Sequence, residues 1–191
     1  SVELGKELVI EAKRLGLEVI AIDNYENAPA MQVADHSLVI DMRNKLILKK
    51  TIQEIQPDFV VPEIEALSID ALKELEVEGV KIVPNARTVE ITMNRDKIRD
   101  LASKDLKIKT AKFKYVYNFE ELEKKSFEIG FPLLLKPLMS SSGKGQSFVE
   151  NNEYLLDAWN EALANSRGRI VGVILEEFIK FDYEFTLLTV R

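Results

Sequence analysis

The sequence predicts an α/β protein with a doubly wound parallel-sheet domain over residues 1–94 and an α+β domain over residues 95–191. In the first half, short apolar runs alternate with amphipathic stretches, as in a parallel sheet with crossover helices. In the second half, the order becomes strand, loop, strand, helix, strand. The chain has 191 residues, 46% of them hydrophobic, which is enough for a substantial core.

The composition excludes several classes of protein. The absence of cysteine rules out disulfides and thiolate metal clusters and fits a reducing compartment. His36 is the single histidine, which makes a histidine-based zinc site or a serine triad improbable and favours a structural role. A net charge of −6 argues against nucleic acid as the main partner. No apolar run approaches the roughly 20 residues of a membrane span, and no leader pattern opens the chain, so we expect a cytoplasmic protein without a membrane partner.

The first domain begins with a predicted helix whose apolar residues Leu4, Leu8 and Leu15 lie at helical spacing and which Gly16 ends. Four strands are expected at residues 17–22, 37–40, 58–61 and 80–83, with helices at residues 45–55 and 67–75 between them. Ligands of open parallel sheets lie beyond the carboxyl ends of the strands. Glu63 follows the third strand and is therefore a candidate for binding a small ligand, with a solvated turn as the alternative.

The second domain begins with a predicted helix that Asn94 caps and that carries Arg95 in its first turn. Alternation over residues 112–117 predicts a half-exposed strand, and Asn118 with Glu121 forms a plausible capping box for the next helix. An apolar strand over residues 131–135 then reaches Lys136. Three elements complete this domain: a return strand at 148–149, a helix with Trp159 in the core, and a strand over 170–175.

A lysine and a polar loop form the most informative part of the sequence. Lys136 leaves a buried strand, which is costly unless its ammonium group meets a negative charge. The loop over residues 139–146 adds three serines, two glycines and Lys144. Glycines let backbone amides approach a polyphosphate, and hydroxyls and lysine add donors and positive charge. We expect the two lysines to hold one triphosphate, although the spacing is not that of a P-loop. The alternative is a flexible hairpin loop with a solvated Lys144.

Acidic residues follow the last apolar strand. Glu176 and Glu177 suit a linker whose backbone meets an adenine edge, and Glu184 could accept hydrogen bonds from ribose hydroxyls. The alternative is two exposed acids at a strand end. Arg95, at a helix start, either adds its charge to the helix dipole for an anion or is solvated.

The motifs occur in an order that resembles one enzyme family. They are Glu3–Glu7, Asn27–Ala34, Val61–Ala66, Thr92–Arg95, Lys136–Pro137, Ser140–Gln146 and Lys180–Glu184. Together they resemble the formate-dependent phosphoribosylglycinamide formyltransferases (formyltransferase 2) of purine biosynthesis, which are ATP-grasp enzymes. The resemblance covers essentially the whole chain, and it implies that residues 95–191 are part of an ATP-grasp domain.

The resemblance also implies roles for individual residues. The implied ATP-contacting residues are Arg95, Lys136, Ser141, Ser142, Gly143, Lys144, Gly145, Gln146, Glu176, Glu177, Phe178, Ile179 and Glu184. Glu3, Leu4 and Glu63 match positions that hold glycinamide ribonucleotide, and Lys136, Ser142 and Lys144 are the implied catalytic residues. In the family, formate and ATP give formyl phosphate and ADP, and the amine of the ribonucleotide captures the formyl group. The family forms homodimers and uses Mg²⁺, whose ligands are expected outside this chain.

The chain departs from the family at both ends. Ser1 and Val2 precede Glu3 where the family has a glycine-rich turn and a first strand, and the C-terminal half of the family is absent. We therefore expect this chain to be a piece of a longer enzyme and inactive by itself. Two alternatives stay open: another purine-pathway ATP-grasp enzyme, such as the synthetase that carboxylates aminoimidazole ribonucleotide, and a non-catalytic nucleotide-binding or interaction module.

Overall fold

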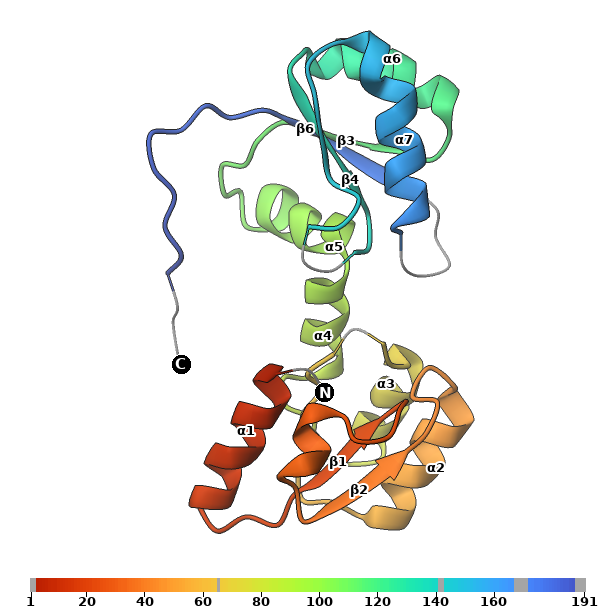
Figure 1. The fold of residues 1–191 in the computed structure, drawn as a ribbon, viewed down its shortest axis with the longest axis vertical. Helices are drawn as coiled ribbons and strands as arrows, with labels where there is room; N and C mark the ends of the chain where they lie inside the picture. Colours follow the sequence, from red (N-terminus) through yellow and green to blue (C-terminus); the bar gives the residue numbers. More distant parts are fainter. Residues whose placement is uncertain (1–2, 65, 141–142, 167–171, 188–191) are drawn as a thin grey trace. The chain divides into compact units, whose positions relative to one another are not determined.

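The computed structural model describes residues 3–64, 66–140, 143–166 and 172–187, and the chain divides into two compact units, Ser1–Met93 and Asn94–Arg191. Both units are mixed α/β structures, which confirms the predicted fold class (Figure 1). The elements of the first unit are α1 (Glu3–Arg14), β1 (Ile20–Asp23), η1 (Pro29–Gln32), β2 (His36–Val39), α2 (Lys45–Ile55), α3 (Ile69–Val77) and α4 (Ala86–Met93). Over the described residues, none of the helices has both the length and the apolar character needed to span a bilayer.

The sheet of the first unit is smaller than the sequence predicts. β1 and β2 pair in parallel, with Ile20 opposite His36. The predicted strands at 58–61 and 80–83 are reduced, among the described residues, to one parallel bridge between Val60 and Ile82. Each of these runs is followed at once by a proline, and a proline has no N–H to continue a ladder of hydrogen bonds. The expectation of full strands there was wrong.

The helices of the first unit follow their sequence signals closely. Residues 45–55 form α2 as predicted, because the Asn44 side chain accepts hydrogen bonds from the backbone N–H groups of Leu46 and Ile47. Its apolar side packs with α3 and α4 in a core that includes Leu48, Leu72 and Leu75. The sequence did not predict α4, which is short and carries only two buried residues.

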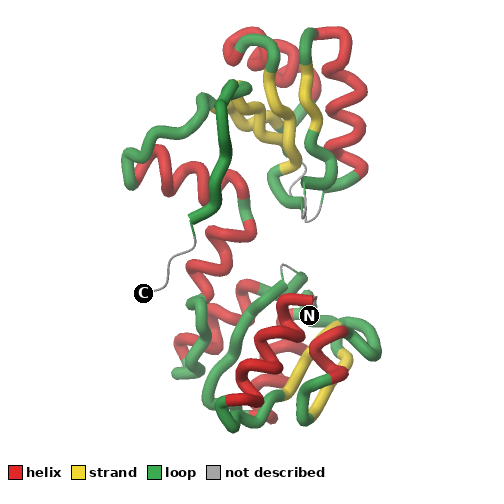
Figure 2. The backbone as a smooth tube through the Cα atoms, turned by 60° about the vertical axis from the view of Figure 1, so that its left-hand side comes forward, coloured by secondary structure: helices red, strands yellow, loops and turns green. Residues whose placement is uncertain are grey.

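The second unit contains a four-stranded antiparallel sheet in the order β3-β6-β4-β5 (Figure 2). Its strands are β3 (Phe113–Val116), β4 (Leu133–Pro137), β5 (Ser147–Val149) and β6 (Val173–Glu177). Its helices are α5 (Arg95–Asp100), η2 (Leu101–Asp105), α6 (Phe119–Ile129), η3 (Asn152–Tyr154) and α7 (Leu155–Ala164). The predicted hairpin return is confirmed, because β5 pairs antiparallel with β4.

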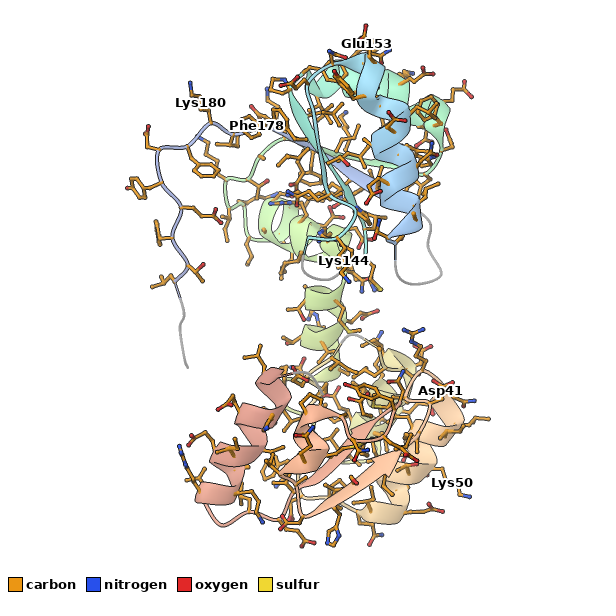
Figure 3. All side chains as sticks on the ribbon, in the orientation of Figure 1. Asp41, Lys50, Lys144, Glu153, Phe178 and Lys180 are labelled. Carbon is orange, nitrogen blue, oxygen red and sulfur yellow. The ribbon has the colours of Figure 1, made fainter. Side chains whose placement is uncertain are left out.

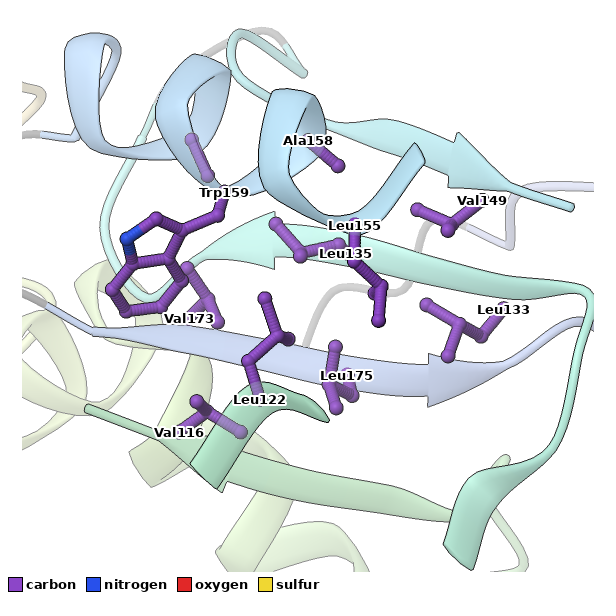
Figure 4. Close-up of a cluster of buried hydrophobic side chains, with 11 residues drawn as sticks. Val116, Leu122, Leu133, Leu135, Val149, Leu155, Ala158, Trp159, Val173 and Leu175 are labelled. Atoms are coloured by element: carbon purple, nitrogen blue, oxygen red, sulfur yellow. The ribbon is translucent and has the colours of Figure 1, made fainter. Parts of the chain in front are cut away.

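One face of this sheet carries the hydrophobic core, which lies under α6 and α7 (Figure 4). Alternate residues of β4 and β6, such as Leu133 and Leu175, point into it and are fully buried. Leu122 of α6 and Trp159 of α7 close the core from the helix side, so the predicted core position of Trp159 is confirmed. The alternation leaves the opposite face of the same strands free for other side chains.

Two helix starts in this unit differ in their capping. Asn118 accepts a hydrogen bond from the backbone N–H of Glu121 at 2.9 Å, as predicted for the start of α6. Asn94 lies at the N-cap of α5, but its side chain makes no capping hydrogen bond, and that prediction was wrong. After α5 the chain continues into η2, a π-helical turn that the sequence pattern did not reveal.

Candidate functional site

The face of the four-stranded sheet opposite the core carries charged side chains. In the ladder, Ile174 of β6 lies opposite Tyr115 on one side and Lys136 on the other. Glu176 lies two residues further along β6, on the same face. Helix α5 contacts this face, because Arg99 pairs with Glu176 and Asp100 accepts a hydrogen bond from the Tyr115 hydroxyl. The site is therefore built from three strands and one helix of a single unit.

Glu176 lies at the centre of this cluster, between two cations. Lys136 Nζ donates a hydrogen bond to Glu176 Oε2 at 2.6 Å, and the Arg99 guanidinium pairs with Oε1. Glu176 is 4% exposed, so the two partners satisfy a carboxylate that has almost no contact with water. The sequence analysis expected the Lys136 ammonium group to meet a negative charge, and the Glu176 carboxylate of the same chain provides it. Glu176 lies within β6 rather than in a linker after it, and its side chain is buried, so the alternative of an exposed acid was wrong for Glu176. The expected contact of this backbone with adenine stays a prediction.

The electrostatics of the cluster follow from burial and these partners. Burial alone raises the pKa of Glu176, but the hydrogen bond from Lys136 and the charges of Lys136 and Arg99 outweigh it and hold this pKa below its usual range. Burial lowers the pKa of Arg95, which the charge of Glu176 partly opposes. Burial and the hydrogen bond to Asp100 raise the pKa of Tyr115, so its hydroxyl stays protonated. Because two cations pair with one carboxylate, the three side chains Lys136, Arg99 and Glu176 together carry a positive charge, which suits a phosphate group.

Arg95 makes hydrogen bonds to the start of the loop over residues 139–146, which we call the glycine loop. Its Nη1 donates to the Pro137 carbonyl oxygen at 2.7 Å and lies 3.0 Å from Ser140 Oγ. Its backbone N–H donates to the carbonyl oxygen of Leu138 at 3.1 Å. These contacts tie the start of α5 to the segment that leaves β4. The predicted anion-binding Arg95 is therefore half-buried and bonded to the chain, rather than solvated.

The glycine loop places Lys144 between two glycines in left-handed conformations. Gly143 has φ 69° and Gly145 has φ 71°, a backbone conformation that residues other than glycine rarely adopt. Lys144 is exposed, and Figure 3 labels it at this loop. Ser141 and Ser142 lie outside the described residues. That Lys144 and Lys136 hold the same triphosphate stays a prediction.

The remaining predicted nucleotide contacts follow β6. Glu177 Oε2 accepts a hydrogen bond from the backbone N–H of Lys112 at 3.1 Å. The Phe178 ring makes an edge-on contact with Phe148 of β5, with 4.9 Å between ring centroids. Ile179 and Glu184 are exposed in a segment without helix or strand (Figure 2), and Gln146, at the end of the glycine loop, is also exposed.

The predicted ribonucleotide-binding residues lie in the first unit. Glu3 and Leu4 begin α1, and Leu4 is 74% exposed. Glu63 is half-buried in the segment after the Val60 bridge. His36 is exposed, and its Nε2 lies 3.2 Å from a carboxylate oxygen of Glu18. Among the described residues, no group of three or more histidine or acidic side chains could hold a metal ion.

Sequence reasoning missed Arg99, Asp100 and Tyr115. Arg99 lies one helical turn after Arg95, so the two arginines share a side of α5, and this spacing was the available signal. The alternation over residues 112–117 placed Tyr115 on one face of a strand without indicating which partner its hydroxyl would meet.

Comparison with known proteins identifies the fold of both units. Residues 101–191 match the family model of the ATP-grasp domain, and residues 1–93 match that of the ribonucleotide synthetase preATP-grasp domain. The second unit thus matches an ATP-grasp domain, and the first unit matches the domain that precedes it in ribonucleotide synthetases. Tyr115, Lys136 and Glu176 lie within the matched ATP-grasp residues, as does the glycine loop, whereas Arg95, Arg99 and Asp100 directly precede that range.

Several sequence relatives share one name. A formate-dependent phosphoribosylglycinamide formyltransferase of Prochlorococcus marinus subsp. pastoris is 80% identical over 189 residues, which cover 99% of this chain and 48% of that protein. An enzyme of the same name from P. marinus strain SARG is 56% identical over the same shares of both chains. The resemblance inferred from the motifs is confirmed. The chain spans about half the length of the curated relatives it matches.

Solved structures agree with the fold. The structure of glycinamide-RNase-transformylase T from Mycobacterium tuberculosis is 35% identical, with a TM-score of 0.75 over 95% of this chain and 47% of that chain. An ADP complex of an N5-carboxyaminoimidazole ribonucleotide synthetase is 26% identical, with a TM-score of 0.80 over 94% of this chain and 45% of that chain. The ATP-grasp fold is thus shared with both the formyl-transferring and the carboxylating relatives.

Proposed function

We propose that this chain is part of an enzyme that formylates glycinamide ribonucleotide with formate and ATP. The observation that carries this proposal is the 80% identity over 189 residues with an enzyme of that name. The solved transformylase T is also more similar in sequence, at 35%, than the carboxylating synthetase at 26%. The domain boundary that we propose lies at about residue 94, between the ribonucleotide-side domain and the nucleotide-binding domain.

ATP is the proposed ligand of the second unit. The ADP complex of a structural relative supports it, as does the net positive charge around Glu176. Lys136 and Lys144 are proposed to contact the phosphates, with the backbone of the glycine loop and with Ser141 and Ser142. Arg95, which is bonded to the start of the glycine loop, is proposed to contact the same phosphates. Glu176, Glu177, Phe178, Ile179 and Glu184 are proposed to surround the nucleoside.

The proposed reaction has two steps. A formate oxygen attacks the γ-phosphorus of ATP, and the bond to the bridging oxygen breaks, which gives formyl phosphate and ADP. The amine of the ribonucleotide then attacks the formyl carbon, and phosphate and a proton leave. Fixed cations such as Lys136 and Lys144 would offset the charge that develops on the transferred phosphoryl group, and catalysis of this kind depends on positioning and electrostatics.

We propose that Mg²⁺ and glycinamide ribonucleotide bind to residues outside the charged cluster. No described group of acidic side chains fits a Mg²⁺ ion, so we propose that the Mg²⁺ ligands lie outside this chain. Glu3, Leu4 and Glu63 of the first unit are the proposed contacts of glycinamide ribonucleotide. A homodimer and a cytoplasmic location are proposed on the family resemblance.

A coupled assay on the full-length enzyme tests the proposed function. ADP release should require formate, ATP and glycinamide ribonucleotide together, and the product should carry the formyl group. ADP release with bicarbonate and aminoimidazole ribonucleotide instead would assign the chain to a carboxylating synthetase. Tight ATP binding with no turnover of either substrate pair would favour a non-catalytic nucleotide-binding protein.

A further inference from the structure

We propose that Arg99 is a positioning residue that acts on Lys136 through Glu176. In this arrangement Arg99 fixes one oxygen of the Glu176 carboxylate, and the other oxygen of the same carboxylate fixes the Lys136 ammonium group. The inference rests on the proposed function only in placing the triphosphate of a nucleotide next to Lys136. Neither the motifs nor the relatives assign a role to Arg99.

The geometry makes Glu176 the link between the two cations. Lys136 and Glu176 are diagonal neighbours on adjacent strands, because Lys136 lies opposite Ile174 and Glu176 lies opposite Leu134. Each cation uses a different carboxylate oxygen. A change at Arg99 therefore reaches Lys136 through one intervening side chain.

Helix α5, which carries Arg99, is hydrogen-bonded to the sheet near both of its ends. At one end of α5, Arg95 bonds to the Pro137 carbonyl group. At the other end, the hydroxyl of Tyr115 donates to Asp100 Oδ1 at 2.8 Å. The helix is thus hydrogen-bonded to β4 before Arg99 and to β3 after it. These bonds fix the backbone position from which the Arg99 side chain reaches Glu176.

The charge of Arg99 also keeps Lys136 available to an anion. A lone pair of Lys136 and Glu176 would be electrically neutral, and a phosphate would gain little from approaching it. With Arg99 present, the Glu176 carboxylate divides its charge between two cations, so Lys136 keeps part of its charge for an anion. This effect of Arg99 is exerted through Glu176 and disappears when Glu176 is replaced. Arginine suits this role because it stays charged and holds its donors in a rigid plane, whereas lysine carries a point charge on a flexible stem.

Replacing Arg99 also changes the protonation of Glu176. The ionisable groups on this face are Lys136 from β4, Arg95 and Arg99 from α5, and Tyr115 from β3, with Asp96 and Asp100 of α5 next to the Tyr115 hydroxyl. Lys136 and Arg99 lower the pKa of Glu176 against the opposing effect of burial. The loss of Arg99 therefore raises that pKa, and Lys136 loses its ionised partner at a higher pH.

The experiment measures nucleotide binding and turnover with the full-length enzyme. Arg99→Gln should weaken the binding of a fluorescent ATP analogue, in the absence of formate and ribonucleotide, by about 10–100-fold, the scale for misplacing a contact group. Arg99→Lys should restore part of this loss. The KM for glycinamide ribonucleotide should stay unchanged. Lys114→Gln is the matched control, because it removes an exposed ion pair with Glu128 from the same sheet.

A double-mutant comparison separates a positioning role from a merely structural one. If Arg99 acts through Glu176, the variant with both Arg99→Gln and Glu176→Gln should bind nucleotide no more weakly than Glu176→Gln alone. In Arg99→Gln the acidic limb of the pH dependence of binding should move to higher pH. Additive losses, an unmoved pH profile, or unchanged affinity in Arg99→Gln would overturn the inference. Because binding is measured without the other substrates, a failed formylation assay would leave this result interpretable.

Discussion

Lys136 Nζ lies 2.6 Å from Glu176 Oε2, so the lysine that we propose to contact the triphosphate is held by a carboxylate from the neighbouring strand. The pair is largely buried, with side-chain exposures of 18% for Lys136 and 5% for Glu176. An ion pair in such a place is expensive to desolvate and contributes little net stability compared with apolar residues of similar volume. A role in placing the ammonium group for a ligand accounts for such a pair beside the glycine loop.

Replacing Lys136 by methionine should reduce turnover of the full-length enzyme. We expect a loss of about 10²–10³ in kcat, the scale for removing one positioned donor from a transition state. Lys114→Met provides the control, since Lys114 pairs with Glu128 at an exposed position of the same sheet and should keep normal turnover. Steady-state kinetics at saturating ATP, formate and ribonucleotide measure the effect. An unchanged kcat in Lys136→Met would show that this lysine takes no part in the chemistry.

Replacing Glu176 by glutamine should destabilise the protein, because Lys136 and Arg99 would then face a neutral amide. Breaking one partner of a buried pair costs about 3–5 kcal/mol in free energy of unfolding, and the partial exposure of both cations favours the lower end. Urea unfolding of the full-length protein measures this. The exposed carboxylate of Glu128 offers the comparison, and Glu128→Gln should cost much less. Equal losses in the two variants would contradict the prediction.

The two glycines of the loop should differ in their tolerance of alanine. A Cβ at Gly145 would lie 2.8 Å from the Asn165 Cβ and 2.9 Å from the Pro137 Cγ, whereas a Cβ at Gly143 would meet nothing within 4 Å. Both positions have positive φ, so Gly143→Ala should cost about 1 kcal/mol in free energy of unfolding from backbone strain alone. Gly145→Ala adds overpacking and should cost about 1–3 kcal/mol more. Thermal unfolding ranks the two, and equal costs would show that the loop relaxes freely.

The first unit should lose stability in acid through Glu74. Hydrogen bonds from Lys45 and Lys49 lower the pKa of Glu74 from 4.5 to about 2. Because the folded pKa is the lower one, the ionised carboxylate stabilises the fold above about pH 4.5, and this contribution disappears as the pH falls towards 2. Glu74→Gln should therefore show a shallower fall in Tm between these pH values. Glu54→Gln removes a longer contact of 3.6 Å to Lys50 and should change the slope less.

Local sequence signals predicted most elements of the fold. The helix over residues 45–55, the alternation around Tyr115 and the apolar helix face with Trp159 each depend on residues close together in the chain, and these elements lie near their predicted positions. The short ladder at Val60 and Ile82 was over-predicted, because apolar runs indicate strands without showing how many hydrogen bonds the following prolines remove.

The sequence by itself determined the fold class and the resemblance to the formate-dependent formyltransferases, because these follow from periodicity and from motifs in a fixed order. Only the tertiary structure decided that Glu176 is buried between Lys136 and Arg99. The three residues come from β6, β4 and α5, and strand register and helix placement, which bring them together, depend on pairings between distant parts of the chain. The sequence shows which residues are charged, and the tertiary fold decides which of these charged residues come into contact.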